Sequence, residues 1–199
     1  RRTNSSSCDF GADHFLNPVI LVDGIDFEDK RKGQAIYGKY LQIAESINYP
    51  NGLDHFGKKL RDDNRDLLIL NFPNATPENL ALGKANPGID GGCDYIERNA
   101  MTLIRLIQMT KQSMQDPNQR ITIIGPSMGG LIARYALAYM EKHVAETGTH
   151  NCKLFISQDA PHLGANIPLG TQLVIKSLAN DFGVATANDF LKSRLGNPA

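Results

Sequence analysis

The sequence lacks the features that would point directly to nucleic acid or to a membrane. It has no excess of charge, because 21 Lys and Arg residues balance 21 Asp and Glu residues. A chain without a basic stripe gives no reason to expect nucleic acid or an anionic membrane as its main partner. It contains no run of roughly 18 apolar residues, so no membrane-spanning helix is predicted. Transient contact with a membrane surface stays open, and nothing in the sequence indicates an oligomeric state.

Cysteine is scarce as well. The three cysteines, Cys8, Cys93 and Cys152, are widely spaced and form no C-x-x-C pair, so the sequence predicts no zinc or other metal site. Two alternatives stand for the thiols: all three are free, or one disulfide leaves a single thiol.

Apolar residues make up 41% of the 199 residues, which is enough for one packed domain. Short apolar runs predict buried strands, and these alternate with helical patterns. The strands are expected at 18–22, 67–70, 121–124 and 154–157, and helices at 37–47, 94–114, 129–142 and within 171–195. This alternation is typical of a parallel, doubly wound α/β sheet.

Two local features refine this prediction. Asp94 is expected to cap the second of these helices, with Glu97 as its capping-box partner. The stretch 74–93 is rich in Gly, Pro and Asn and is too long for a simple connection, which favours a loop that forms part of a site.

Three polar segments follow predicted strands: DGID at 23–26, GPSMGG at 125–130 and QDAPHLG at 158–164. In parallel sheets, ligands bind beside the carboxyl ends of the strands. We therefore expect the three segments to meet in one crevice.

Ser127 lies in the sequence Gly-Pro-Ser-Met-Gly, a G-x-S-x-G pattern that follows one buried strand and opens a helix. Such a turn is strained, and its flanking glycines leave room for a serine hydroxyl raised above the sheet. This context favours a nucleophile over a purely structural turn. An oxyanion hole would need two backbone N–H groups, and Met128 and Ile25 are the expected donors.

PVILVDGID, GPSMGGLIARYA and SQDAPHLGANIP, within residues 18–168, resemble the α/β-hydrolase superfamily, and within it the lipases and GPI-inositol-deacylase-like esterases. The resemblance implies a mostly parallel sheet flanked by helices, no cofactor, and a triad of Ser, then an acid, then His. It also implies a division into a polar lead-in at 1–17, a core at 18–170 and the start of a helical lid at 171–199. The chain begins with Arg1, and a processed, serine-rich start together with the resemblance favours a secreted or cell-surface protein.

Three residues need comment against this family. Asp23 stands where the relatives carry His, and its charge would oppose an oxyanion unless it points away or pairs, with Arg134 or Lys30 as expected partners. Asp159 is the candidate acid, or alternatively a turn residue. His162 is the candidate base, or alternatively lines the cleft. A simpler expectation is that the base follows Ala199, with the acid either there too or at Asp159.

The sequence therefore predicts a serine ester hydrolase that acts on a lipid or another acyl ester through an acyl-enzyme on Ser127. An acyltransferase or peptidase using the same serine is the alternative within this fold. The alternative from another class is a hydrolase-like binding module without catalysis.

Overall fold

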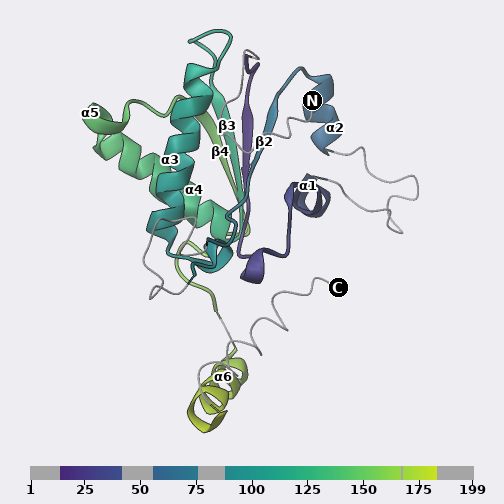
Figure 1. Ribbon diagram of the computed structural model, residues 1–199, viewed down its shortest axis with the longest axis vertical. Helices are drawn as coiled ribbons and strands as arrows, with labels where there is room; N and C mark the ends of the chain where they lie inside the picture. Colours follow the sequence, from purple (N-terminus) through teal and green to yellow (C-terminus); the bar gives the residue numbers. More distant parts are fainter. Residues whose placement is uncertain (1–13, 42–55, 76–87, 167, 183–199) are drawn as a thin grey trace.

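A four-stranded parallel sheet forms the centre of the computed structural model, which describes residues 14–41, 56–75, 88–166 and 168–182 (Figure 1). The strands are β1 (Val19–Val22), β2 (Leu67–Leu70), β3 (Ile121–Pro126) and β4 (Cys152–Gln158). Their order is β2-β1-β3-β4 and every pair is parallel. The predicted α/β-hydrolase-type sheet is thus confirmed.

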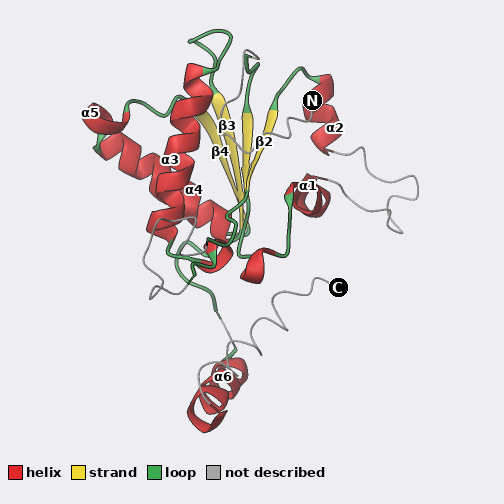
Figure 2. Ribbon diagram, in the orientation of Figure 1, coloured by secondary structure: helices red, strands yellow, loops and turns green. Residues whose placement is uncertain are grey.

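Helices cover both faces of this sheet (Figure 2). On one face lie α3 (Ile96–Gln112) and α4 (Met128–Lys142), and on the other lie α1 (Gly33–Leu41) and α2 (Phe56–Asp62). Short turns of helix, η1 (Phe27–Asp29), η2 (Gly91–Cys93) and α5 (Val144–Thr147), connect them. The last described helix, α6 (Leu169–Phe182), lies apart from the sheet at the bottom of Figure 1.

Two apolar clusters hold these layers together, one on each face of the sheet. The side chains of β1 alternate between them: Ile20 and Val22 pack towards α3 and α4, and Val19 and Leu21 towards α1. Each of the four is at most 1% exposed. Burial of one such side chain contributes about 1.5–3 kcal/mol, so β1 is a rigid base for the turn that follows it.

The fourth strand differs from the prediction of a buried strand. Leu154 is 49% exposed and Ile156 is 38% exposed. The reason is its position, since β4 pairs only with β3 among the described strands, and a cavity that Phe56 and Leu60 of α2 also line opens beside Leu154 and Ile156.

The predicted cap of α3 is wrong. The residue that precedes the helix is Tyr95, without a side-chain cap, and the Asp94 carboxylate instead accepts hydrogen bonds from Arg98 Nη1 at 2.9 and 3.1 Å. An arginine one turn into the helix competes for the carboxylate that was expected to cap it. The described part of 74–93 contains η2 and a bridge between Ala75 and Ile89, while 76–87 lies outside the described residues.

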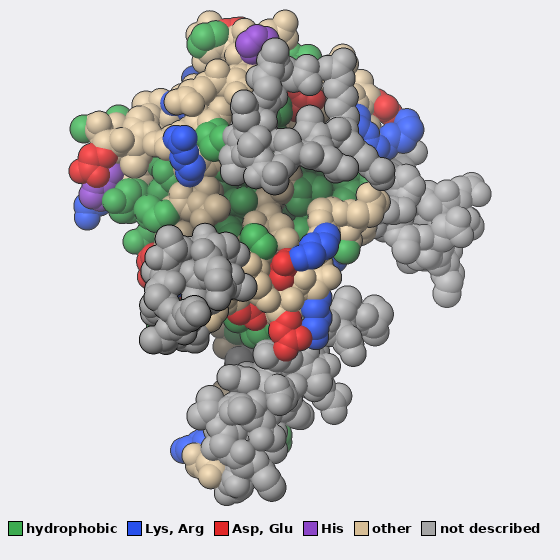
Figure 3. Space-filling model, in the orientation of Figure 1, with side chains coloured by type: hydrophobic (Ala, Val, Ile, Leu, Met, Phe, Trp, Pro, Cys, Tyr) green, Lys and Arg blue, Asp and Glu red, His purple; other side chains and the backbone are tan. Residues whose placement is uncertain are grey.

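Charge is mixed on the one face of the molecule that Figure 3 draws. On the face drawn in Figure 3, the described Lys and Arg side chains are interspersed with Asp and Glu. No helix among the described residues is long and apolar enough to cross a membrane.

Candidate active site

Ser127 occupies the sharp turn between β3 and α4. Its backbone has φ 52° and ψ −129°, a conformation that few non-glycine residues adopt and that stores about 1–3 kcal/mol of strain. Two hydrogen bonds hold it there: Ser127 N–H donates to the Gln158 carbonyl at 2.9 Å, and Gly130 N–H donates to the Ser127 carbonyl at 3.0 Å. The surrounding structure therefore imposes the strained turn that the G-x-S-x-G pattern predicts.

The glycines after the serine allow α4 to approach its neighbours closely. A Cβ atom on Gly129 would lie 2.3 Å from the Val22 carbonyl oxygen, and one on Gly130 would lie 2.5 Å from the Ala160 Cβ. Both distances are shorter than a side chain tolerates. The start of α4 is thus wedged between the segment after β1 and the segment after β4.

The three polar segments do meet at the carboxyl ends of the strands. A Cβ on Gly24 would lie 3.1 Å from the Ser127 Cβ, and the segment after β4 binds the Ser127 amide. These contacts confirm the prediction that the three segments meet.

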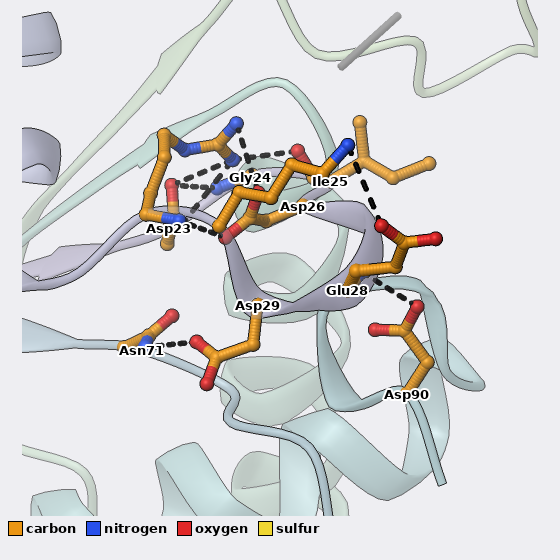
Figure 4. A network of polar contacts seen from close by, with 10 residues as sticks. Asp23, Gly24, Ile25, Asp26, Glu28, Asp29, Asn71 and Asp90 are labelled. Carbon is orange, nitrogen blue, oxygen red and sulfur yellow. Dashed lines mark hydrogen bonds and ion pairs between the residues drawn. The ribbon is translucent and has the colours of Figure 1, made fainter. Parts of the chain in front are cut away.

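Asp23 is paired, but with neither predicted partner. Its carboxylate lies 3.3 and 3.4 Å from Arg31 Nη2 and accepts the Gly24 N–H at 2.8 Å (Figure 4). The expectation of Arg134 or Lys30 is therefore wrong, and Lys30 instead pairs with Glu28 at 3.5 Å. The side chain of Asp23 is only 1% exposed.

Burial decides the electrostatics of this turn. It raises the pKa of the Asp23 carboxyl above its ordinary value, and the Arg31 guanidinium and the Gly24 N–H, which lower that pKa, offset only part of the effect. Burial and the neighbouring Asp23 charge raise the pKa of Tyr40 to about 12. Tyr40 Oη would lie 3.1 Å from a Cβ on Gly24, so a protonated phenol faces the turn from α1.

The raised pKa predicts how Asp23→Asn changes stability with pH. A carboxyl whose pKa is higher in the folded state stabilises that state fully below its unfolded pKa, and this contribution is lost as pH rises through the folded pKa. Wild-type stability should therefore fall relative to that of Asp23→Asn as pH rises from about 3 to 7. Urea unfolding of both proteins across this range measures the difference. An increase in the stability of the wild type relative to the variant with rising pH would contradict the prediction.

The two candidate triad partners lie in the segment after β4. Asp159 is exposed and has φ 48°. His162 Nε2 lies 2.7 Å from Ser157 Oγ, and the buried His162 Nδ1 has no hydrogen-bond partner among the described residues. The structure gives no hydrogen bond between Asp159 and His162, or between His162 and Ser127, within the described part of the chain. Both roles stay predictions.

A cavity of about 910 Å³ opens beside Met128, next to the elbow. One wall is the outer face of α4, the other is the start of α3, and His162 lies at the same cavity. From α4 it is lined by Met128, Leu131, Arg134, Tyr135 and Ala138. The elbow thus stands at one end of a largely apolar groove.

Sequence reasoning missed Arg31 and Ser157. Arg31 was visible only as part of the basic run 30–32, and the need of Asp23 for a cation was the one signal that could have found it. Nothing in the sequence paired Ser157 with His162.

The described residues contain no group of three or more His, Cys, Asp and Glu side chains that could hold a metal ion. Cys93 and Cys152 form no disulfide in the described part of the chain, and Cys8 lies outside it.

Comparison with known proteins adds one finding. Residues 85–184, half of the chain, match the model of a family described as "Putative serine esterase (DUF676)". No curated protein and no solved structure matches the chain. The matched segment contains α3, the elbow with Ser127, and β4.

Proposed function

Because the chain belongs to this serine esterase family, we propose that it hydrolyses carboxylic esters through an acyl-enzyme formed on Ser127. The observation that carries the proposal is the strained backbone of Ser127 at the end of a buried parallel strand, in contact with the turn after β1. A strained turn that two neighbouring segments enforce is typical of a nucleophile that must be held clear of the sheet.

The reaction has two halves. Ser127 Oγ attacks the ester carbonyl carbon while a histidine takes the hydroxyl proton, and the carbonyl oxygen becomes an oxyanion. The C–O bond then breaks, and the leaving alcohol receives that proton. In the second half water attacks the acyl carbon and loses a proton to the same histidine. The bond between that carbon and Ser127 Oγ then breaks, and the histidine returns the proton to Oγ as the carboxylic acid leaves. His162 is the candidate base, with Asp159 as candidate acid.

The hydrogen bonds of the backbone amides in the turn after β1 support Ile25 as one oxyanion donor. Gly24 N–H donates to its neighbour's carboxylate, and Asp26 N–H donates to the Gly92 carbonyl at 2.9 Å. Among the described residues no hydrogen bond uses the Ile25 N–H, so it is the amide of this turn that is left for a substrate. Met128 N–H, at the start of α4, is the second proposed donor, and the helix dipole adds positive potential there.

The groove beside the elbow favours an acyl chain as the group that is held. Met128, Leu131, Tyr135 and Ala138 recur every three or four residues and therefore share one side of α4. We accordingly propose a lipid or another apolar acyl ester as substrate, with no cofactor, and a secreted or cell-surface location with transient contact to a membrane surface.

A series of p-nitrophenyl esters tests this function. The protein, expressed at the length its gene encodes, is expected to release p-nitrophenol from acetyl, octanoyl and palmitoyl esters, because an acyl carbon is the centre that Ser127 attacks. Octanoate should be preferred over acetate, since an apolar chain of that length gains burial in the groove. The matched control is p-nitrophenyl phosphate, which should not react. A folded protein that hydrolyses none of the acyl esters would contradict the proposal.

A further inference from the structure

The Arg31 side chain binds three residues of the turn after β1. Its Nη2 donates to the Ile25 carbonyl at 2.6 Å and lies 3.3 Å from Asp23 Oδ1, and its Nη1 lies 3.5 Å from Asp26 Oδ1. Its own backbone N–H donates to Asp26 Oδ2 at 2.7 Å. Figure 4 shows Asp23, Ile25 and Asp26 gathered around these contacts. The turn is therefore tied at both ends and in the middle by one side chain.

Burial of these three charged side chains is unfavourable because it removes them from water. The Arg31 side chain is 11% exposed, and those of Asp23 and Asp26 are 1% and 4% exposed. Removing such charges from water costs several kcal/mol for each ion, which ion pairing repays only when the geometry is good. The buried Nε of Arg31 has no hydrogen-bond partner among the described residues, so the loss of hydration is only partly compensated. Incompletely compensated charge beside a nucleophile is a reason to seek a role in function.

The opposite side of the same turn faces the nucleophile. Gly24 is the residue whose Cβ would touch Ser127 Cβ, and the neighbouring Ile25 N–H is the amide left for a substrate. The peptide that carries this N–H lies between Asp23 and the Ile25 carbonyl, both of which Arg31 binds. Movement of the guanidinium would thus allow the Ile25 amide to rotate.

We propose that Arg31 is a positioning residue for ester hydrolysis, which holds the 23–26 turn so that the Ile25 N–H points at the oxyanion and which balances the charge of Asp23 beside it. The inference rests on the proposed function, and it gives Arg31 and Asp23 together a task in the reaction. Neither residue touches the substrate. Without the guanidinium, a buried carboxylate two residues from the donor would repel the oxyanion in a region of low dielectric.

The test uses Arg31→Met and Arg31→Lys, with rates expressed per active site after titration with a fluorophosphonate. We expect kcat per titrated site to fall about 100-fold in Arg31→Met, with KM within about threefold of wild type. Affinity for a trifluoromethyl ketone, which forms a tetrahedral oxyanion on the serine, should fall by a similar factor. Arg31→Lys keeps the charge but not the two-pronged set of N–H donors. This variant should fold, and its kcat per titrated site should fall about tenfold. A purely structural role would lower the number of titratable sites and leave kcat per site unchanged.

Two further variants sharpen this test. Lys30→Met is the matched control, because Lys30 is the neighbouring cation and forms a surface pair with Glu28, so its kcat should equal that of wild type. Asp23→Asn in the Arg31→Met protein removes the unbalanced charge while Oδ1 still accepts the Gly24 N–H, so part of the lost rate should return.

The outcomes separate the two proposals. A wild type that hydrolyses esters through Ser127, together with Arg31 variants of unchanged kcat per site and unchanged ketone affinity, would overturn the role of Arg31 and leave the esterase function in place. A folded wild type that neither reacts with the fluorophosphonate nor hydrolyses esters would overturn both.

Discussion

Gly129→Ala is expected to destabilise the protein by about 3 kcal/mol and to slow ester hydrolysis by about 100-fold or more. The added Cβ would lie 2.3 Å from the Val22 carbonyl oxygen and 2.7 Å from that of Asp23. Both are backbone atoms at the end of a buried strand and cannot turn aside as a side chain could. The start of α4 must therefore move away from β1, and Ser127 and the Met128 amide move with it.

The matched control is Gly170→Ala. Gly170 is also the second residue of a helix, α6, but nothing lies within 4 Å of the position its Cβ would take. Urea unfolding and p-nitrophenyl ester hydrolysis should separate the two variants, with Gly170→Ala within about 0.5 kcal/mol of wild type. Equal stability of both variants would show that α4 does not pack as closely on β1 as described here.

Replacement of Ser127 has the largest expected effect on rate, and alanine and glycine should differ in stability. Both variants lack the nucleophile, so ester hydrolysis should fall about 10³-fold or more. Alanine keeps a Cβ at φ 52°, whereas glycine adopts this conformation freely. Since the strain is about 1–3 kcal/mol and the extra chain entropy of glycine costs about 0.5–1 kcal/mol, Ser127→Gly should be more stable than Ser127→Ala by about 1 kcal/mol.

Chemical denaturation of the two variants measures this difference directly. Ser113→Ala is the control for rate, because Ser113 has ordinary backbone geometry (φ −102°) and follows α3 at the end away from the cavity, so its loss should keep ester hydrolysis close to wild type. An alanine variant at least as stable as the glycine variant would contradict the strain at the elbow, and residual wild-type hydrolysis in either would contradict the role of Ser127.

The features that the sequence predicted well are those that local residues determine. Four β-branched residues in a row at 121–124 form a strand wherever both faces of a sheet are covered, and the glycines on either side of Ser127 permit a turn that larger residues would prevent. Because parallel strands align their carboxyl ends, the order of strands and motifs also predicted which segments would meet.

The features that could not be predicted from the sequence depend on contacts between distant or competing residues. Lys30 and Arg31 are adjacent cations, and the sequence could not show which of them turns inward. Positive φ angles at Glu28 and Asp29 reverse the chain and leave Arg31, not Lys30, beside Asp23. The exposed face of β4 was missed for a similar reason. The apolar pattern of a strand is the same whether or not another element covers it.

The role of Ser127 as nucleophile is tested most directly by identifying the residue that a fluorophosphonate modifies. The protein at its encoded length is treated with the probe, digested, and its peptides are analysed by mass spectrometry beside those of Ser127→Ala. We predict one adduct, on the peptide that contains Ser127, and none in the variant. An adduct on another serine, or a folded wild type without any adduct, would contradict this prediction.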